Sequence, residues 1–235
     1  TGNPRPALVG LERPGNNKNT NSIIAFDLNS KKITWSFQEV AHDLWDFDIA
    51  SPPILTELKI KNKILEIIVV TTKIGNVLIF ERSSGKPLFD IDYKKAPISN
   101  IPGEETAKFQ INLESPEKLY DTHDYSNINK DKLKNYIYGF FEPPQIGRKL
   151  ITYGLHGGAT WPGSAVDPTS NSLFTPINKI PFYLVVEGKT LNQKFPKNSK
   201  KTHSLYLNKC SSCHGKNRNG NFDPNSKKKN EIIVN

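Results

Sequence analysis

The chain contains no methionine and only two cysteines among its 235 residues. Two cysteines cannot build the disulfide framework that stabilises small secreted domains. No apolar run approaches the ~18 residues that a membrane-spanning helix requires. A start methionine and a signal peptide are also missing, and Thr1-Gly2-Asn3-Pro4 resembles a loop from the middle of a protein. We therefore expect the chain to be a fragment of a longer protein.

Acidic side chains are outnumbered, with 23 Asp and Glu against 32 Lys and Arg, which gives a net charge of +9. Such an excess suits an anionic partner. The lysines are scattered among asparagines, however, and no stripe of aromatic residues runs between them. A solvated basic surface is therefore favoured over nucleic-acid binding.

Short apolar runs, 17 prolines and 15 glycines predict an all-β fold with many turns. Three stretches, 23–37, 79–89 and 165–174, each combine an acid, a polar turn and an aromatic residue in the manner of a β-hairpin. Such repetition predicts propeller blades, in which the acid fixes the turn and the aromatic wedges between neighbouring sheets. Three unrelated hairpins are the alternative.

Residues 64–72 form a predicted buried strand and residues 76–80 its return, with Lys73 in the turn between them. A lysine there can simply extend its ammonium group to solvent. Residues 90–147 are polar and irregular, with one short helix expected near 129–138, and they predict an insertion that walls a binding site.

Residues 151–163 combine four glycines with Trp161. Glycine allows close approach to a ligand, and the indole of Trp161 offers a stacking face. His156, within the same stretch, is expected to be a hydrogen-bonding loop residue and not a metal ligand.

Residues 42–48, with the sequence HDLWDFD, place three carboxylates and one imidazole around a tryptophan. Asp43, Asp46 and Asp48 cannot all remain ionised at close range unless a cation or a basic side chain lies among them. The stretch indicates a cation site in which one carboxylate serves as a base. An acidic surface turn is the alternative.

Residues 188–201 form a basic linker, and residues 202–209 a predicted short helix that leads to Cys210-Ser211-Ser212-Cys213-His214. Cys210 and Cys213 can form thioethers to a haem, with His214 as the axial iron ligand. A redox dithiol and half of a zinc site are the competing interpretations. Covalent haem attachment occurs outside the cytoplasm, so the motif predicts a periplasmic protein. Because the chain lacks methionine, the distal iron ligand is open.

Residues 1–187 resemble the pyrroloquinoline-quinone (PQQ) dehydrogenases, the quinoprotein propellers that oxidise glucose and alcohols, and they resemble the membrane glucose dehydrogenase branch most. The resemblance rests on WSFQ at 35–38, HDLWD at 42–46, KIGNV at 73–77, and WPG at 161–163 followed by VDP at 166–168. It implies an all-β fold: a partial eight-bladed β-propeller of about three to four blades. A small α-helical cytochrome c segment is expected to begin at 202 and to include residues 202–235.

The resemblance also implies roles for individual residues. Asp46 corresponds to the general base and Lys73 to the basic side chain near the quinone oxygens. Asn3 corresponds to a ligand of the Ca²⁺ ion, which Asp46 and Asp48 are expected to bind as well. The acid at Asp48 does not distinguish calcium from a lanthanide.

Thr160 and Trp161 match family positions that contact PQQ, and Thr160 matches only loosely. Together these features predict a periplasmic enzyme that oxidises an alcohol or aldose with PQQ and Ca²⁺ and passes electrons through haem c to a quinone or cytochrome. Membrane association of the parent protein is left open. The alternatives are a non-catalytic propeller scaffold and an electron carrier that acts only through its haem segment.

Overall fold

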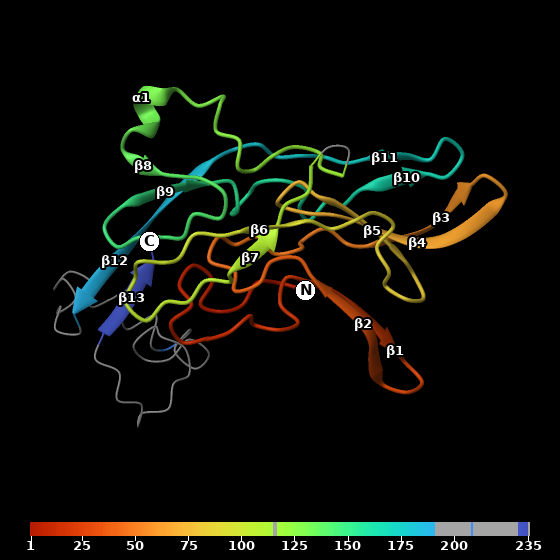
Figure 1. Ribbon diagram of the computed structural model, residues 1–235, viewed down its shortest axis with the longest axis horizontal. Helices are drawn as coiled ribbons and strands as arrows, with labels where there is room; N and C mark the ends of the chain where they lie inside the picture. The colour runs from red at the N-terminus through yellow and green to blue at the C-terminus, as the bar shows by residue number, and fades with distance from the viewer. Residues whose placement is uncertain (115–116, 191–207, 209–229, 235) are drawn as a thin grey trace. The chain divides into compact units, whose positions relative to one another are not determined.

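The structure, a computed structural model, describes residues 1–114, 117–190, 208 and 230–234 and consists mostly of short strands (Figure 1). The larger compact unit comprises Thr1–Val186 and includes Val234, and the smaller comprises Glu187–Ile233. Cys210, Cys213 and His214 lie outside the described residues, as does the predicted linker from residue 191 onward.

The first predicted hairpin is confirmed. Strands β1 (Ser22–Asp27) and β2 (Lys32–Gln38) pair antiparallel, with an irregularity between Ala25 and Phe26. The carboxylate of Asp27 accepts a 2.5 Å hydrogen bond from the backbone N–H of Ser30, as expected of an acid that fixes its turn.

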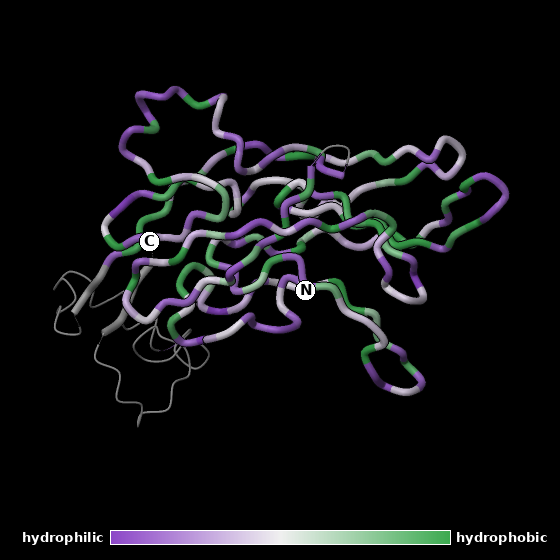
Figure 2. The backbone as a smooth tube through the Cα atoms, in the orientation of Figure 1, coloured by the Kyte–Doolittle hydropathy of each residue, from purple (hydrophilic) through white to green (hydrophobic). Residues whose placement is uncertain are grey.

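A three-stranded antiparallel sheet follows, made of β3 (Ile54–Ile60), β4 (Lys63–Thr71) and β5 (Val77–Glu81) in that order. Strands β4 and β5 were expected from the sequence, whereas β3 was missed. The tip of the β3–β4 hairpin is hydrophilic and its base is hydrophobic (Figure 2), because β4 runs from exposed Lys63 into the buried stretch 67–71.

The aromatic wedge occurs between the first two hairpins. Phe80 of β5 packs against Trp35 and Phe37 of β2, with ring centroids 5.9 and 4.9 Å apart.

The third hairpin pairs β10 (Ala165–Asp167) with β11 (Ser172–Phe174), and Asp167 again fixes the turn. Phe174, however, is 63% exposed, so in the described part of the chain it does not wedge between two sheets.

Residues 90–147 are more ordered than predicted. They contain β6 (Tyr93–Lys95), β7 (Phe109–Ile111), the single-turn α1 (Lys130–Leu133) and β8 (Tyr136–Ile137). The expected helix near 129–138 is too long, because Tyr136 and Ile137 pair in parallel with β9 (Lys149–Thr152) instead of continuing α1. Buried Ile111 and Leu113 show that this segment also contributes to the core.

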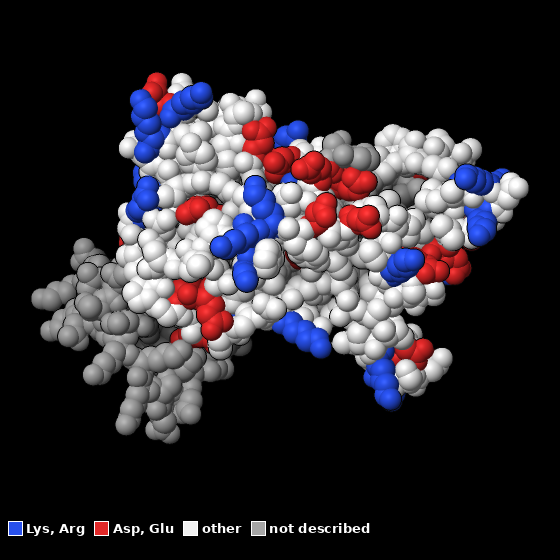
Figure 3. Space-filling model, in the orientation of Figure 1, with Lys and Arg blue, Asp and Glu red and all other residues white. Residues whose placement is uncertain are grey.

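Strand β9 pairs on its other side with β12 (Phe182–Thr190), and the sheet order is β13-β12-β9-β8, with β13 at Asn230–Val234. Among the residues described, no helix has the length and apolar character needed to cross a bilayer. On the face shown in Figure 3, acidic side chains lie among the basic ones.

Candidate active site

The HDLWDFD stretch is a tight turn held by its first aspartate. Asp43 is fully buried, and its carboxylate accepts hydrogen bonds from the backbone N–H groups of Trp45 (2.8 Å) and Phe47 (2.9 Å) and from the side-chain amide of Asn21 (2.8 Å). Burial raises the pKa of Asp43 to about 6, although the bonds from Trp45 and Asn21 act in the opposite direction. Asp43 therefore orients the turn.

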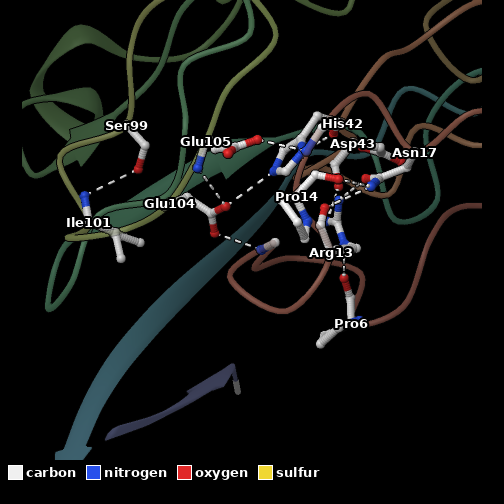
Figure 4. A network of polar contacts seen from close by, with 12 residues as sticks. Pro6, Arg13, Pro14, Asn17, His42, Asp43, Ser99, Ile101, Glu104 and Glu105 are labelled. Atoms are coloured by element: carbon white, nitrogen blue, oxygen red, sulfur yellow. Dashed lines mark hydrogen bonds and ion pairs between the residues drawn. The ribbon is translucent and has the colours of Figure 1, made fainter. Parts of the chain in front are cut away.

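A second group of contacts fixes the start of the same turn (Figure 4). His42 Nε2 lies 3.1 Å from Glu104 Oε1, and both side chains are only 1% exposed. Glu104 Oε2 accepts a 2.6 Å bond from the N–H of Gly10. The guanidinium group of Arg13 donates to the Asp43 carbonyl oxygen at 2.5 Å. His42 thus helps to hold the start of the turn in place.

The aromatic residues of the turn anchor it in the core. Trp45 and Phe47 pack against Phe141, with ring centroids 5.0 and 5.7 Å away, and the indole N–H of Trp45 donates to the Glu142 carbonyl oxygen at 2.6 Å. Asp46, between them, has a positive φ of 65°. This left-handed conformation is uncommon outside glycine, although aspartate tolerates it better than most residues. It separates Asp46 from the aromatic cluster.

Three charged side chains meet at the centre of the site. Lys73 Nζ lies 3.0 Å from Asp46 Oδ2 and 2.5 Å from Asp48 Oδ1, and it also donates to the Asp46 carbonyl oxygen at 3.0 Å. Asn3 Nδ2 donates to Asp46 Oδ1 at 2.6 Å. The side chains of Lys73, Asp48 and Asp46 are 5%, 9% and 18% exposed. The structure therefore brings together Asn3, Asp46, Asp48 and Lys73 from distant parts of the sequence.

The environment adjusts the proton affinity of two of these groups. Burial raises the pKa of Asp46, and this effect outweighs the opposing charge and hydrogen bond of Lys73. Burial also lowers the pKa of Lys73, but the hydrogen bond to Asp48 and the charges of both carboxylates outweigh it, so the pKa of Lys73 is raised overall. Lys73 is consequently an ammonium ion at neutral pH, and Asp46 is a stronger base than an exposed aspartate.

The turn that carries Lys73 is clamped by backbone contacts. The Tyr120 hydroxyl donates to the Lys73 carbonyl oxygen at 3.0 Å, and the Ala159 N–H donates to the Thr72 carbonyl oxygen at 3.1 Å.

Two glycines of the stretch 151–163 pack closely against other parts of the backbone. A Cβ atom on Gly158 would lie 2.2 Å from the Lys73 carbonyl oxygen, and one on Gly154 would lie 1.8 Å from the carbonyl oxygen of Trp45. The glycines expected to admit a ligand therefore bring residues 151–163 against the protein's own backbone.

The two predicted PQQ contacts follow Ala159, whose N–H bonds to the residue before Lys73. Thr160 is half-buried and directly follows Ala159, and Trp161 is 78% exposed. Trp161 lines a pocket of about 500 Å³ together with Ile49, Val70 and Pro52. An exposed indole above aliphatic walls offers a stacking face for a planar ring. His156 is exposed, and its ring centroid lies 4.8 Å from that of Phe182.

The side chains at the centre are of the chemical types that bind a hard cation. Asp46, Asp48 and Asn3 carry oxygen donors, which calcium prefers. In the part of the chain that the structure describes, no group of three or more His, Cys, Asp and Glu side chains is arranged to hold a metal. Calcium takes six to eight oxygen ligands, so these three residues provide part of a coordination shell. The Asn3 amide presents its nitrogen to Asp46 and must rotate to offer its oxygen.

Replacing Lys73 with methionine tests how strongly the ammonium group stabilises the site. Methionine preserves apolar bulk but leaves Asp46 and Asp48 facing each other without a cation, so we expect the free energy of unfolding to fall by about 3 kcal/mol. Urea denaturation without added metal measures this change, and added Ca²⁺ should recover part of it.

The matched control is Lys134→Met, which breaks the exposed ion pair with Asp131. Exposed pairs contribute little to stability, so this variant should unfold close to wild type. Equal stability of the two variants would contradict the role given to Lys73.

Sequence reasoning missed the residues that hold Lys73 in place. Tyr120 lies in a segment that was expected to be an irregular insertion. Glu39 and Asn76 are also buried beside the Lys73 turn. Only Asn76 carried a signal, because it closes the Lys73-Ile74-Gly75-Asn76 turn.

The structure combines antiparallel hairpins that share an acid-turn pattern with a buried centre of two aspartates and a lysine, and repeated hairpins of this kind are typical of a β-propeller. The family model for the glucose/ethanol/alcohol dehydrogenase β-propeller domain of PQQ enzymes matches residues 1–227. The chain belongs to this family of PQQ-dependent dehydrogenase propellers.

Individual relatives agree with that assignment. The chain is 30% identical over 187 residues to quinoprotein glucose dehydrogenase A of Acinetobacter calcoaceticus, covering 72% of this chain and 23% of that protein. It is 30% identical over 189 residues to the glycerol dehydrogenase large subunit of Gluconobacter oxydans, covering 74% and 25%. The chain thus spans about a quarter of the length of these relatives.

Among solved structures, quinohemoprotein alcohol dehydrogenase from Comamonas testosteroni matches with a TM-score of 0.50 and 21% identity. The match covers 79% of this chain and 24% of that structure. At this identity the similarity supports the propeller fold, and it agrees with the strand-rich architecture of the first unit.

Proposed function

We propose that the complete protein is a periplasmic PQQ-dependent dehydrogenase that oxidises an alcohol or aldose and delivers the electrons to a covalently attached haem c. The observation that carries this proposal is the buried centre in which Lys73 joins Asp46 and Asp48 while Asn3 contacts Asp46. It combines a carboxylate of raised pKa, a fixed cationic side chain and oxygen donors for a metal in one place.

Asp46 is the proposed general base. Burial makes its carboxylate more basic, which favours removal of the hydroxyl proton of a bound substrate. When bound, PQQ would accept the hydride, and a divalent cation such as Ca²⁺ would polarise the adjacent quinone carbonyl as a Lewis acid. Lys73 donates a hydrogen bond to one carboxylate oxygen of Asp46, which restricts the orientation of the carboxylate before the substrate binds.

Lys73 is proposed to present its ammonium group to the quinone oxygens, where its raised pKa keeps it charged. Asn3, Asp46 and Asp48 would contribute oxygen ligands to the metal, and Trp161 and Thr160 would border the cofactor. The proposal specifies only the class of the substrate, an alcohol or an aldose. This class agrees with the glucose and glycerol named for the relatives.

The haem segment is proposed to be an insertion within the propeller. Cys210, Cys213 and His214 lie in the chain between β12 and β13, which are neighbours in one sheet. The propeller family match also continues to residue 227, beyond this motif. Both observations support a haem motif that interrupts the propeller sequence. Attachment of this haem would require export, which supports the periplasmic location.

The decisive experiment measures haem reduction in the complete protein with and without added PQQ and Ca²⁺. A panel of aldoses and primary alcohols is supplied, and the reduced haem band is followed. We expect at least one substrate to reduce the haem only when PQQ and Ca²⁺ are present.

Each rival predicts a different result. A non-catalytic propeller gives no reduction under any condition and binds no PQQ. An electron carrier that acts only through its haem segment is reduced by an external donor equally well without PQQ. Either outcome would refute the proposed dehydrogenase.

A further inference from the structure

Glu39 is a buried acid directly after β2. Its side chain contacts the two residues that flank the turn 73–75, called the Lys73 turn below. It is 2% exposed, and its backbone N–H donates to the Asn21 carbonyl oxygen at 2.9 Å. Its Oε1 atom accepts hydrogen bonds from the Thr72 hydroxyl and from Asn76 Nδ2, each at 2.8 Å. Thr72 and Asn76 stand on either side of Lys73, and the Thr72 N–H also bonds to the Asn76 carbonyl oxygen at 3.1 Å.

Two buried oxygen atoms in this cluster find no hydrogen-bond partner within the described part of the chain. They are Glu39 Oε2 and Asn76 Oδ1, and they belong to side chains already joined by one hydrogen bond. If Glu39 were a carboxylate, both atoms would be acceptors without a donor, which is costly in a buried site. One proton on Glu39 Oε2 would give both atoms a partner, because the acid O–H can donate to the amide oxygen of Asn76.

We propose that Glu39 is a neutral carboxylic acid in the folded protein, paired reciprocally with the Asn76 amide, and that this pair is the positioning element for the Lys73 turn. The amide N–H donates to Oε1 and the acid O–H donates back to Oδ1. Ionisation of Glu39 removes the bond from its acid O–H to Asn76 Oδ1. It also places a negative charge in the buried site next to the turn. The positioning part rests on the proposed function of Lys73, whereas the protonation of Glu39 does not.

The surroundings of Glu39 agree with a neutral acid. Burial raises its pKa to about 7, although the hydrogen bonds from Thr72 and Asn76 act in the opposite direction. Two more distant charges reach it: the positive charge of Lys118 lowers the pKa and the negative charge of Asp43 raises it.

This proton has a thermodynamic consequence of definite sign. The reference pKa of glutamate is 4.5, and the folded value is about 7. Between these values the folded state holds more protons than the unfolded state, so the contribution is fully present below pH 4.5 and is lost as pH rises through 7. Within that window the folding equilibrium constant should fall by up to about tenfold per pH unit because of this one group.

The test compares the complete protein with its Glu39→Gln variant. Glutamine keeps the oxygen that accepts from Thr72 and replaces the acid O–H with an amide N–H, so it imitates the protonated state permanently. We expect wild type at pH 6 to show an infrared C=O band of a buried carboxylic acid that shifts on ¹³C-glutamate labelling and is absent from Glu39→Gln. We also expect the loss of stability between pH 4.5 and 7 to be smaller in Glu39→Gln than in wild type, because only the part caused by Glu39 disappears and the parts caused by the raised pKa values of Asp43 and Asp46 remain.

The matched control is Glu57→Gln, which makes the same chemical change at an exposed carboxyl group on β3. It should retain the acid band and the wild-type pH dependence of unfolding. If wild type lacks the band at pH 6, or if Glu39→Gln unfolds with the same pH dependence as wild type, Glu39 is ionised and the proposal is overturned.

Positioning is measured by PQQ affinity. Wild type should lose affinity for PQQ as pH rises from 6 to 8, and Glu39→Gln should hold its affinity constant over that range. Equal pH dependence in the two proteins would overturn the positioning role. If no PQQ binds to either protein, the proposed function fails, while the infrared and unfolding results still decide whether Glu39 carries a proton.

Discussion

Replacing Asp46 with asparagine in the complete protein loaded with PQQ and Ca²⁺ is expected to lower kcat by about two to four orders of magnitude. Asparagine has the same shape, and its oxygen can still accept the hydrogen bond that Lys73 donates to Asp46 at 3.0 Å. It cannot accept a proton from the substrate hydroxyl. Pre-steady-state measurement of haem reduction at saturating substrate reports this step.

A matched control for this variant is Asp131→Asn, in which an exposed carboxylate on α1 loses its charge. It should retain wild-type turnover. A PQQ titration of Asp46→Asn separates loss of chemistry from loss of cofactor, because a missing base lowers kcat at full PQQ occupancy. Turnover of Asp46→Asn within tenfold of wild type would refute the assignment of Asp46 as the base.

Replacing Gly158 with alanine is expected to lower the free energy of unfolding by about 4 to 5 kcal/mol, near the upper end for a single substitution. Gly158 has a φ of 70°, which alanine adopts only with strain. The new methyl group would also lie 2.2 Å from the carbonyl oxygen and 2.5 Å from the Cα atom of Lys73. The backbone of Lys73 must then move, so PQQ affinity should fall with stability. Chemical denaturation and a PQQ titration measure the two effects.

Gly147→Ala separates the strain of a positive φ from the clash. Gly147 also has a φ of 70°, but no atom lies within 4 Å of the position where its Cβ would be. This variant should lose only the ~1 to 2 kcal/mol of a left-handed alanine and retain its affinity for PQQ. If Gly158→Ala and Gly147→Ala are equally stable, the close packing of Gly158 on Lys73 does not constrain the site.

The hairpins were predictable because their signals are local. Alternating apolar residues and an acid before a polar turn lie within about 15 residues of one another, and Asp27 and Asp167 fix their turns in the structure as expected. Strand β3 was missed because Pro52 and Pro53, which directly precede it, are typical of a loop, although the polar and apolar residues of the strand alternate. Strands of two or three residues, such as β6 and β8, are too short for any periodicity.

The candidate site was predictable only in part. Family resemblance selected Asn3, Asp46 and Lys73, and the structure places their side chains in contact. The supports of the site were hidden because each is formed by distant segments. Nothing in the local sequence distinguishes buried Glu39 from a surface acid, and the partner of Gly158 is a backbone 85 residues earlier in the chain.

The indole hydrogen bond of Trp45 to Glu142 also determines when the site can form during folding. It closes a loop of 97 residues, and the His42–Glu104 contact closes one of 62. Such contacts form late, because the entropy of closing long loops must be overcome first. The Asp46–Lys73 centre is therefore expected to be complete only when the rest of the first unit has assembled, and PQQ or a metal ion bound there would stabilise only the finished fold. Under the proposed function, loading of the cofactor would therefore favour fully assembled chains over partly folded ones.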